Sequence, residues 1–238
     1  MSFLSDNCFF SPYTEDIIKS CDTFSCGDDD MDDFFRNDAL DYATFMMGRS
    51  YCFRQNEDPR KIVCVFTVSN DSIRIYDLPR SRRDFMLKIT HHQKRLNRYP
   101  GILVGRIGVN IEFARKGVGS SVLDFVKEWF ADETNKSGCR FVIVDAVNTP
   151  AVLSFYQKNG FTFLFTTEDQ EELYTNPPKT EEEKKQRLQK TSSSVYSHHV
   201  FRPAQLGVIS RLMQRPFHLI LKESQRQDSF RIEGSRID

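Results

Sequence analysis

Two stretches of the sequence decide the predicted fold. Residues 102–120 read ILVGRIGVNIEFARKGVGS, and residues 141–165 read FVIVDAVNTPAVLSFYQKNGFTFLF. Each begins with an apolar run typical of a buried strand. Between them, VLDFVKEWFADE (122–133) repeats apolar residues at helical spacing, and Pro150 suits the first turn of another helix. The order strand, glycine turn, helix, strand, helix, strand predicts an α/β (α+β) domain that contains a parallel pair of strands.

The flanking segments predict further elements of the same domain. SYCFR (50–54) and KIVCVFTVS (61–69) read as strands joined by a turn, the second of them buried on both faces. We expect residues 70–71 to end that strand, and Pro100 and Gly101 within residues 99–101 to end the basic segment that follows it. Asp28–Asp30 after Gly27 is typical of a helix start, because carboxylates there cap free N–H groups. The apolar segment 200–223 is expected to return one strand to the sheet, whereas residues 1–20 show no sustained period.

Composition excludes several classes of protein. The 238 residues fit one large domain or two small ones, and 39% hydrophobic residues with 21 Phe are enough for a core. Lys+Arg 33 against Asp+Glu 33 excludes a chain that is basic throughout but allows a local basic patch. No apolar run could span a membrane, and the N-terminus lacks the features of a secretory signal. The 6 Cys show no zinc spacing, so we expect reduced thiols, no metal site and a cytoplasmic protein.

The expected organisation is a single domain over residues 1–222 followed by a polar, flexible tail over 223–238. A polar linker or insertion is expected near 175–199, where prolines, charges and serines gather. A basic insertion near 80–98 contains Arg80, Arg82, Arg83, Lys88, Lys94, Arg95 and Arg98, with a His91-His92 pair. It reads either as a solvated loop or helix or as a phosphate-binding surface.

Residues 114–120, ARKGVGS, predict an anion site between a strand and a helix. Glycines let backbone N–H groups converge, and the following helix points its positive end at the same place. The segment is neither a dinucleotide-binding G-x-G-x-x-G nor a Walker loop. By itself, it would fit a tight turn equally well.

The context of this turn resembles the GNAT superfamily of acyl-CoA-dependent N-acyltransferases. Its parts occur in order from Val104 to Phe161: the loop ARKGVG, the strand RFVIVDAV ending at Asn148, and a helix with Phe155-Tyr156. The family usually has Arg or Gln at the first loop position, where this chain has Ala114. The resemblance implies a mixed, mostly antiparallel sheet with splayed central parallel strands flanked by helices.

The same resemblance implies acetyl-CoA as cosubstrate and assigns the site residues. Tyr156 matches the tyrosine that protonates the departing thiolate, although an aromatic core anchor is the alternative reading. Backbone groups on one splayed strand would bind the pantetheine and polarise the thioester carbonyl, and the glycine turn would cradle the pyrophosphate. The residues implied for binding are Ile107, Gly108, Val109, Arg115, Lys116, Gly117, Val118, Gly119, Ser120 and Asn148.

The acceptor implied by the resemblance is a primary amine of unspecified identity. Arg106 and Asp145 are candidates for binding it, and Glu112 and Asp145 are candidates for a general base. An α-amine, with a pKa of about 7.7–8.0, would need less help than a lysine side chain. A module that binds CoA or a partner without catalysis is the alternative of another class. A homodimer also remains open, and no membrane partner is expected.

A second resemblance concerns the N-terminal region. Phe24-x-Cys26-Gly27, then Met31–Phe35 and Ala39, looks like the signature of GNAT-type toxins of toxin–antitoxin pairs, as does Gly105-Arg106-x-Gly108-Val109. Those relatives acetylate the α-amine of aminoacyl-tRNA. The resemblance therefore implies tRNA as an alternative partner, held through the basic 80–98 stretch.

Overall fold

The protein is built on one mixed sheet. The computed structural model describes residues 3–90, 96–165, 167–183 and 205–211, and all structural statements concern these residues. The sheet has seven strands in the order β1-β2-β3-β4-β5-β7-β6. Only β4 and β5 are parallel; every other neighbouring pair is antiparallel. The strands are β1 Cys8–Pro12, β2 Arg49–Gln55, β3 Ile62–Arg74, β4 Arg98–Val109, β5 Phe141–Val147, β6 Thr162–Phe163 and β7 Gln205–Arg211.

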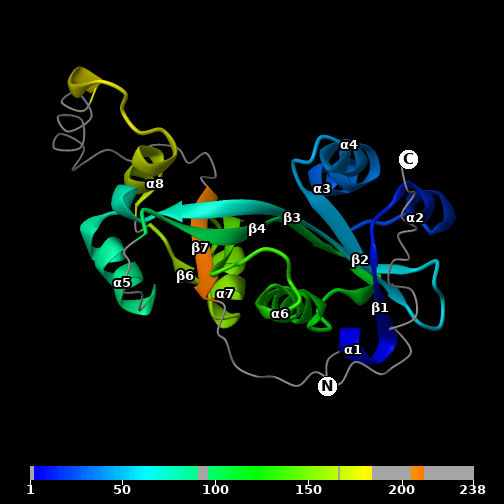
Figure 1. The fold of residues 1–238 in the computed structure, drawn as a ribbon. Helices are drawn as coiled ribbons and strands as arrows, with labels where there is room; N and C mark the ends of the chain where they lie inside the picture. The colour runs from blue at the N-terminus through cyan, green and yellow to red at the C-terminus, as the bar shows by residue number, and fades with distance from the viewer. Residues whose placement is uncertain (1–2, 91–95, 166, 184–204, 212–238) are drawn as a thin grey trace, which may run out of the picture.

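Helices cover both faces of this sheet. In Figure 1, α3 and α4 lie above it, α6 and α7 lie below it, and α5 and α8 lie at one end. The α-helices are α1 Phe3–Asn7, α2 Glu15–Ser20, α3 Asp29–Asp33, α4 Ala39–Thr44, α5 Arg80–Thr90, α6 Val118–Ala131, α7 Pro150–Lys158 and α8 Glu168–Thr175. A π-helical turn, η1 Phe34–Asp38, joins α3 to α4, and 3-10 turns occupy η2 Ile75–Asp77 and η3 Ile111–Phe113. No described helix is long and apolar enough to cross a membrane.

The predicted order of elements in the central region is confirmed. Helix α6 follows the glycine turn, and α7 begins with Pro150 after the cap residue Thr149, whose hydroxyl accepts from the N–H of Val152. Gly160 ends this helix with φ +79°, a conformation that glycine adopts without strain. The predicted return strand is β7, which lies between β5 and β6.

The long β3–β4 pair corrects two predicted interruptions. Asn70 and Asp71 pair with Ile102 and Gly101, so β3 continues to Arg74, and residues 99–101 lie inside β4. The side chains of Asn70 and Asp71 are both exposed, so their presence in the strand lowers the stability of the fold only slightly. Cross-strand pairing outweighs their low strand propensity. The preceding segment 62–68 is buried throughout, as predicted.

The N-terminal elements were missed by the sequence analysis. Residues 3–20 form α1, β1 and α2, each too short for a periodic pattern to reveal it. Tertiary contacts stabilise them instead. Phe10 on β1 packs against Tyr51, Phe125 and Trp129, with ring centroids 5.3, 4.8 and 5.1 Å from its own. The edge strand therefore depends on the aromatic core beneath it.

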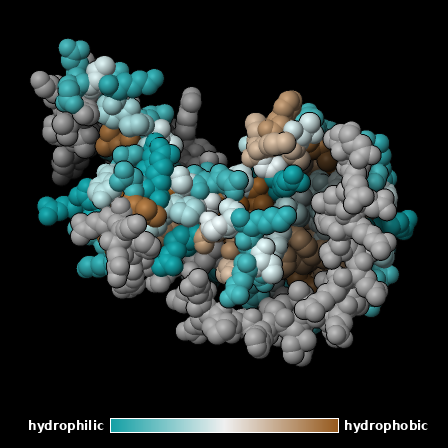
Figure 2. All heavy atoms as spheres, in the orientation of Figure 1, coloured by the Kyte–Doolittle hydropathy of each residue, from teal (hydrophilic) through white to brown (hydrophobic). Residues whose placement is uncertain are grey.

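Besides a smaller cluster that holds α5 at one end of the sheet, two apolar layers attach the helices to its faces. Beneath it, the α6–α7 layer includes Phe66, Val104, Val122, Val144 and Tyr156. Above it, the layer under α2–α4 includes Phe24, Phe34, Phe35, Cys52 and Val65. Figure 2 shows a further apolar group on the surface beside α4, where Phe45, Met46 and Met47 are 72%, 88% and 52% exposed.

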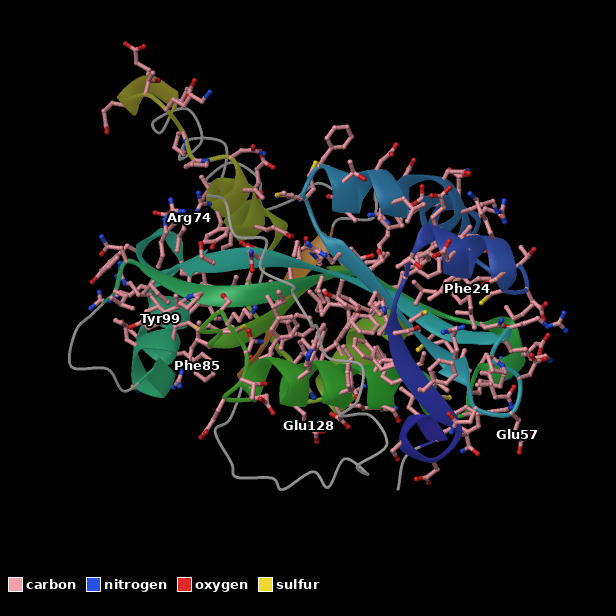
Figure 3. The ribbon with its side chains drawn as sticks, turned by 45° about the vertical axis from the view of Figure 1, so that its right-hand side comes forward. Phe24, Glu57, Arg74, Phe85, Tyr99 and Glu128 are labelled. Carbon is pink, nitrogen blue, oxygen red and sulfur yellow. The ribbon has the colours of Figure 1, made fainter. Side chains whose placement is uncertain are left out.

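Asp32 ties helix α3 to the loop that precedes it. Its carboxylate accepts hydrogen bonds from Ser25 Oγ at 2.6 Å and from the backbone N–H of Cys26 at 2.7 Å. Burial raises the pKa of Asp32, but these hydrogen bonds outweigh that effect and leave the pKa below its ordinary value. Phe24 lies beneath the N-terminal helices (Figure 3), and its ring would lie 3.1 Å from a Cβ added at Gly108. Residues of the N-terminal signature thus have structural roles: Phe24 packs on β4, and Cys26 donates its backbone N–H to Asp32.

We predict that Asp32→Asn lowers the free energy of unfolding at pH 7 by about 1.5–3 kcal/mol, because hydrogen bonds to a charged acceptor are lost. A carboxylate whose pKa is depressed stabilises the fold above its unfolded pKa, and this stabilisation is lost as the pH falls through the folded pKa. The difference between variant and wild type should therefore shrink on acidification below about pH 4. Urea unfolding at several pH values measures it.

The matched control is Asp33→Asn, because Asp33 is exposed. It should change stability by less than about 0.5 kcal/mol. Equal effects of the two substitutions at pH 7 would contradict the assigned role of Asp32.

Candidate active site

The central feature of the candidate site is an opening between β4 and β5. These strands pair only from Gly101↔Phe141 to Val104↔Val144. Beyond that point β4 continues to Val109 and β5 continues to Val147, without further pairing between them. Beyond Val104, the backbone groups of β4 that face β5 are therefore available to a ligand. The splayed parallel strands implied by the resemblance are confirmed.

A β-bulge at Gly105 marks the start of the opening. Val68 pairs with Val104 and Thr67 pairs with Arg106, so Gly105 is an extra residue on β4. Bulges re-aim the side chains that follow them. Here the bulge turns Ile107 and Val109 toward the α6 face, where they pack on its core.

The glycine turn presents a row of unpaired backbone N–H groups. Within the described residues, none of the N–H groups from Arg115 to Ser120 donates a hydrogen bond. Arg115 has φ +63° and Gly117 has φ +77°, and such left-handed residues curve successive N–H groups into an anion-binding concavity. Helix α6 begins at Val118 and adds the positive end of its dipole. This arrangement fits a pyrophosphate.

Gly119 joins the separate parts of the site. A Cβ at this position would lie 3.2 Å from the ring of Phe155 and 3.9 Å from a methyl group of Val109. The first turn of α6 therefore packs directly on α7 and on the free end of β4. Asn148 lies half-buried between β5 and α7, on the same connection that positions Tyr156. Gly119 of the turn, the free end of β4 and helix α7 are thus brought together.

Tyr156 is both a core residue and a candidate acid. It is only 7% exposed and packs between Phe155 and Phe161, with ring centroids 5.1 and 5.4 Å away. Burial, and to a lesser degree the negative charge of Asp145, raises the pKa of Tyr156 to about 12. The phenol therefore remains protonated at neutral pH and can donate a proton or a hydrogen bond.

The acceptor candidates occupy the opposite face of the sheet. The guanidinium carbon of Arg106 lies 3.7 Å from the ring centroid of Phe34, which places this side chain under η1. Asp145 follows Val144 on β5 and is exposed, yet burial by its surroundings and the charge of Asp71 raise its pKa. Glu112 is exposed and forms an ion pair with Lys61 at 2.9 Å, so its carboxylate is already engaged.

Residues 80–90 of the basic stretch form helix α5, at the far end of the sheet from α2 and α3 (Figure 1), and Arg98 is the first residue of β4. Arg80 and Lys88 are exposed, whereas Met86 is buried and attaches the helix to the core. Residues 91–95, including the histidine pair, lie outside the described residues, as do the linker residues 184–199 and the tail 223–238.

Comparison with known proteins agrees with this geometry. Residues 86–163 match the family model of the acetyltransferase (GNAT) domain. No curated protein matches the chain. The resemblance to the GNAT superfamily is thereby confirmed.

Solved structures share the fold at low sequence identity. AtaT complexed with acetyl-methionyl-tRNAfMet is 17% identical with a TM-score of 0.54, covering 67% of this chain and 89% of that one. AtaTR bound with AcCoA is 18% identical with a TM-score of 0.54, covering 69% and 90%. A Tyr-to-Phe mutant of KacT is 15% identical with a TM-score of 0.55, covering 68% and 91%. At these identities the likeness concerns the fold.

We predict that Gly117→Glu abolishes or strongly weakens CoA binding. The substitution forces a Cβ into a left-handed backbone conformation and adds a negative charge to a cradle for anions. Calorimetric titration with CoA measures the change. Gly138→Glu is the control, because it adds the same charge at a glycine with open space around it and without a positive φ. Wild-type affinity in the Gly117 variant would refute the cradle.

Proposed function

We propose that this protein is an acetyl-CoA-dependent N-acetyltransferase that transfers an acetyl group directly to a primary amine. The observation that carries the proposal is the row of unpaired N–H groups from Arg115 to Ser120, which lies beside the opening between β4 and β5. Such donors suit a pyrophosphate, and the part of β4 beyond Val104, which does not pair with β5, offers backbone groups to an extended arm.

Each part of the cosubstrate has a proposed partner. The N–H groups of Arg115–Ser120 hold the pyrophosphate, and the side chains of Arg115 and Lys116 add charge-assisted contacts. Lys116 Nζ lies 5.0 Å from the ring centroid of Phe113, which supports this side chain beside the turn. The pantetheine arm lies in the opening, against the backbone of Ile107–Val109 and next to Asn148.

The proposed chemistry needs few side chains. Acetyl-CoA supplies an activated thioester, and a neutral amine attacks its carbonyl carbon. Backbone N–H groups of β4 stabilise the negative charge that develops on the carbonyl oxygen. Tyr156 donates its proton, or a hydrogen bond, to the departing sulfur as the carbon–sulfur bond breaks, and the attacking nitrogen loses one proton to water as the amide forms. Burial keeps the phenol of Tyr156 protonated but also makes it a weaker acid, which favours a hydrogen bond to the sulfur over complete proton transfer.

The second candidate function is that of a toxin that acetylates the α-amine of aminoacyl-tRNA and blocks translation. Two observations favour it: exposed cations on α5, and similarity of the fold to AtaT, whose structure is described as complexed with acetyl-methionyl-tRNAfMet. An α-amine also has a lower pKa than a lysine side chain, so a larger fraction of it is uncharged and nucleophilic at neutral pH. The alternative outside the enzymes is a module that binds CoA without catalysis. Three further points stay predictions: a single domain over residues 1–222, a cytoplasmic location and a homodimer.

We predict that Tyr156→Phe lowers kcat by about 10²–10⁴-fold and leaves CoA affinity nearly unchanged, because only the acidic hydroxyl is removed. Release of CoA thiol with and without an amine measures turnover, and calorimetry measures affinity. The control is Tyr99→Phe, a buried tyrosine in the separate core cluster next to α5. An unchanged turnover in the Tyr156 variant would remove its proposed role. Thiol release absent from the wild type with every amine would favour the non-catalytic alternative.

For the tRNA candidate, we predict that Arg80→Gln combined with Lys88→Gln weakens tRNA binding and reduces its salt dependence. Each lost phosphate contact should lower the slope of log affinity against log salt by about 0.7–0.9. Filter binding at several salt concentrations measures this slope. Lys136→Gln, an exposed cation in the α6–β5 loop, is the control. Equal slopes for all proteins would argue against α5 as the tRNA surface.

A further inference from the structure

The bulge at Gly105 brings two opposite charges to the same level of the opening. Val104 pairs with Val144, and this is the last paired level of β4 and β5. Because Gly105 is the extra residue, the next ladder position on β4 is Arg106, which pairs with Thr67 on its other side. The next position on β5 is Asp145. Arg106 and Asp145 therefore occupy the first level at which the strands no longer pair.

Both side chains also face the same side of the sheet. Side chains alternate along a strand, and Val104 and Val144 belong to the core layer under α6 and α7. The residues at the next level must point to the opposite face. For Arg106 this is confirmed by its contact with Phe34 of η1.

Arg106 is fixed in place but has no charged partner. Its guanidinium lies 3.7 Å from the ring centroid of Phe34, which is only 4% exposed. Stacking on an aromatic ring orients the guanidinium plane and leaves its N–H edge free to bind an oxyanion. Within the described residues, Arg106 makes no ion pair and no hydrogen bond through its side chain.

Asp145 is equally without a cationic partner. No ion pair involves it in the part of the chain that the structure describes. Its charged and titratable neighbours are Asp71 and Tyr156, and neither neutralises a carboxylate. Cross-strand residues of opposite charge ordinarily pair, but here the parting of the strands leaves both charges available.

The neighbouring surface restricts how an acceptor can reach these residues. Next to Arg106 along β4, Gly108 is covered by Phe24, Cys26 and Phe35, whose atoms would lie 3.1–3.3 Å from an added Cβ. The N-terminal segment therefore closes this face of β4 just beyond Arg106. The uncovered approach lies on the side of β5, where Asp145 is exposed.

We infer that Arg106 and Asp145 form a two-charge acceptor subsite, which selects a primary amine that carries an anionic group in the same molecule. The carboxylate of Asp145 binds the ammonium before its deprotonation, and the guanidinium of Arg106 binds a carboxylate or phosphate oxygen. The inference rests on the proposed acetyl transfer and specifies the class of its acceptor.

The test compares matched acceptors that differ in their anionic group. The pairs are phosphoethanolamine and ethanolamine, methionine and methioninamide, and 3′-O-aminoacyl adenosine with and without a 5′-phosphate. Thiol release from acetyl-CoA gives kcat/KM for each acceptor. In at least one pair, the wild type should prefer the anionic member by roughly tenfold, as expected for one charge-assisted contact.

Two variants separate the roles of the charges. Arg106→Gln should raise KM more for the anionic member of each pair than for the neutral member and so abolish the preference, while Arg106→Lys should restore part of it. Asp145→Asn should raise KM for every amine without changing the affinity for CoA. Arg60→Gln, an exposed arginine in the β2–β3 turn, is the control and should match the wild type.

The outcomes distinguish the subsite from the reaction itself. If the wild type acetylates amines but shows no preference in any pair, the subsite is wrong and the proposed function stands. A preference that survives in Arg106→Gln, or an equal loss for charged and neutral amines, also overturns it. If no amine promotes thiol release in the wild type, the proposed function fails and the subsite with it.

Discussion

The structure depends on one interruption of hydrogen bonding, the end of the ladder between β4 and β5 beyond Val104 and Val144. A central strand of a sheet normally has both edges satisfied, and free backbone groups are costly when buried. Here β3 continues to pair along β4 and β7 continues to pair along β5, so each strand remains held on its outer side. The opening is therefore rigid on both flanks and has unused donors and acceptors along its inner edges.

Glycines make this opening usable. Gly105 provides the bulge that shifts the register of β4, and Gly117 provides the left-handed turn that curves the N–H groups before α6. Gly119 lets the first turn of α6 approach Phe155 and Val109. Each glycine meets a different geometric need.

The two faces of the sheet have different roles in the proposed reaction. The lower face, under α6 and α7, is apolar and contains Tyr156, where burial keeps the phenol protonated. The upper face carries Arg106 and Asp145, and the N-terminal segment held by Asp32 covers the neighbouring part of β4. A cosubstrate entering from one side and an acceptor approaching from the other would meet at the bulge.

The sequence alone determined the elements from Ile102 to Phe165, because long apolar runs, a helical period and glycine and proline punctuation are local properties. It also indicated the anion turn, the GNAT-like fold and the residues around Tyr156. It did not reveal α1, β1 and α2, whose few residues are stabilised by contacts with β2 and α6, and it wrongly ended β3 at residues 70–71, where pairing with β4 extends it. Only the tertiary structure decided which side chains share a level of the sheet. A single extra residue at Gly105 reverses the face of the sheet to which each later side chain of β4 points. A bulge is defined by pairing with the partner strand, so the sequence of β4 alone does not reveal it.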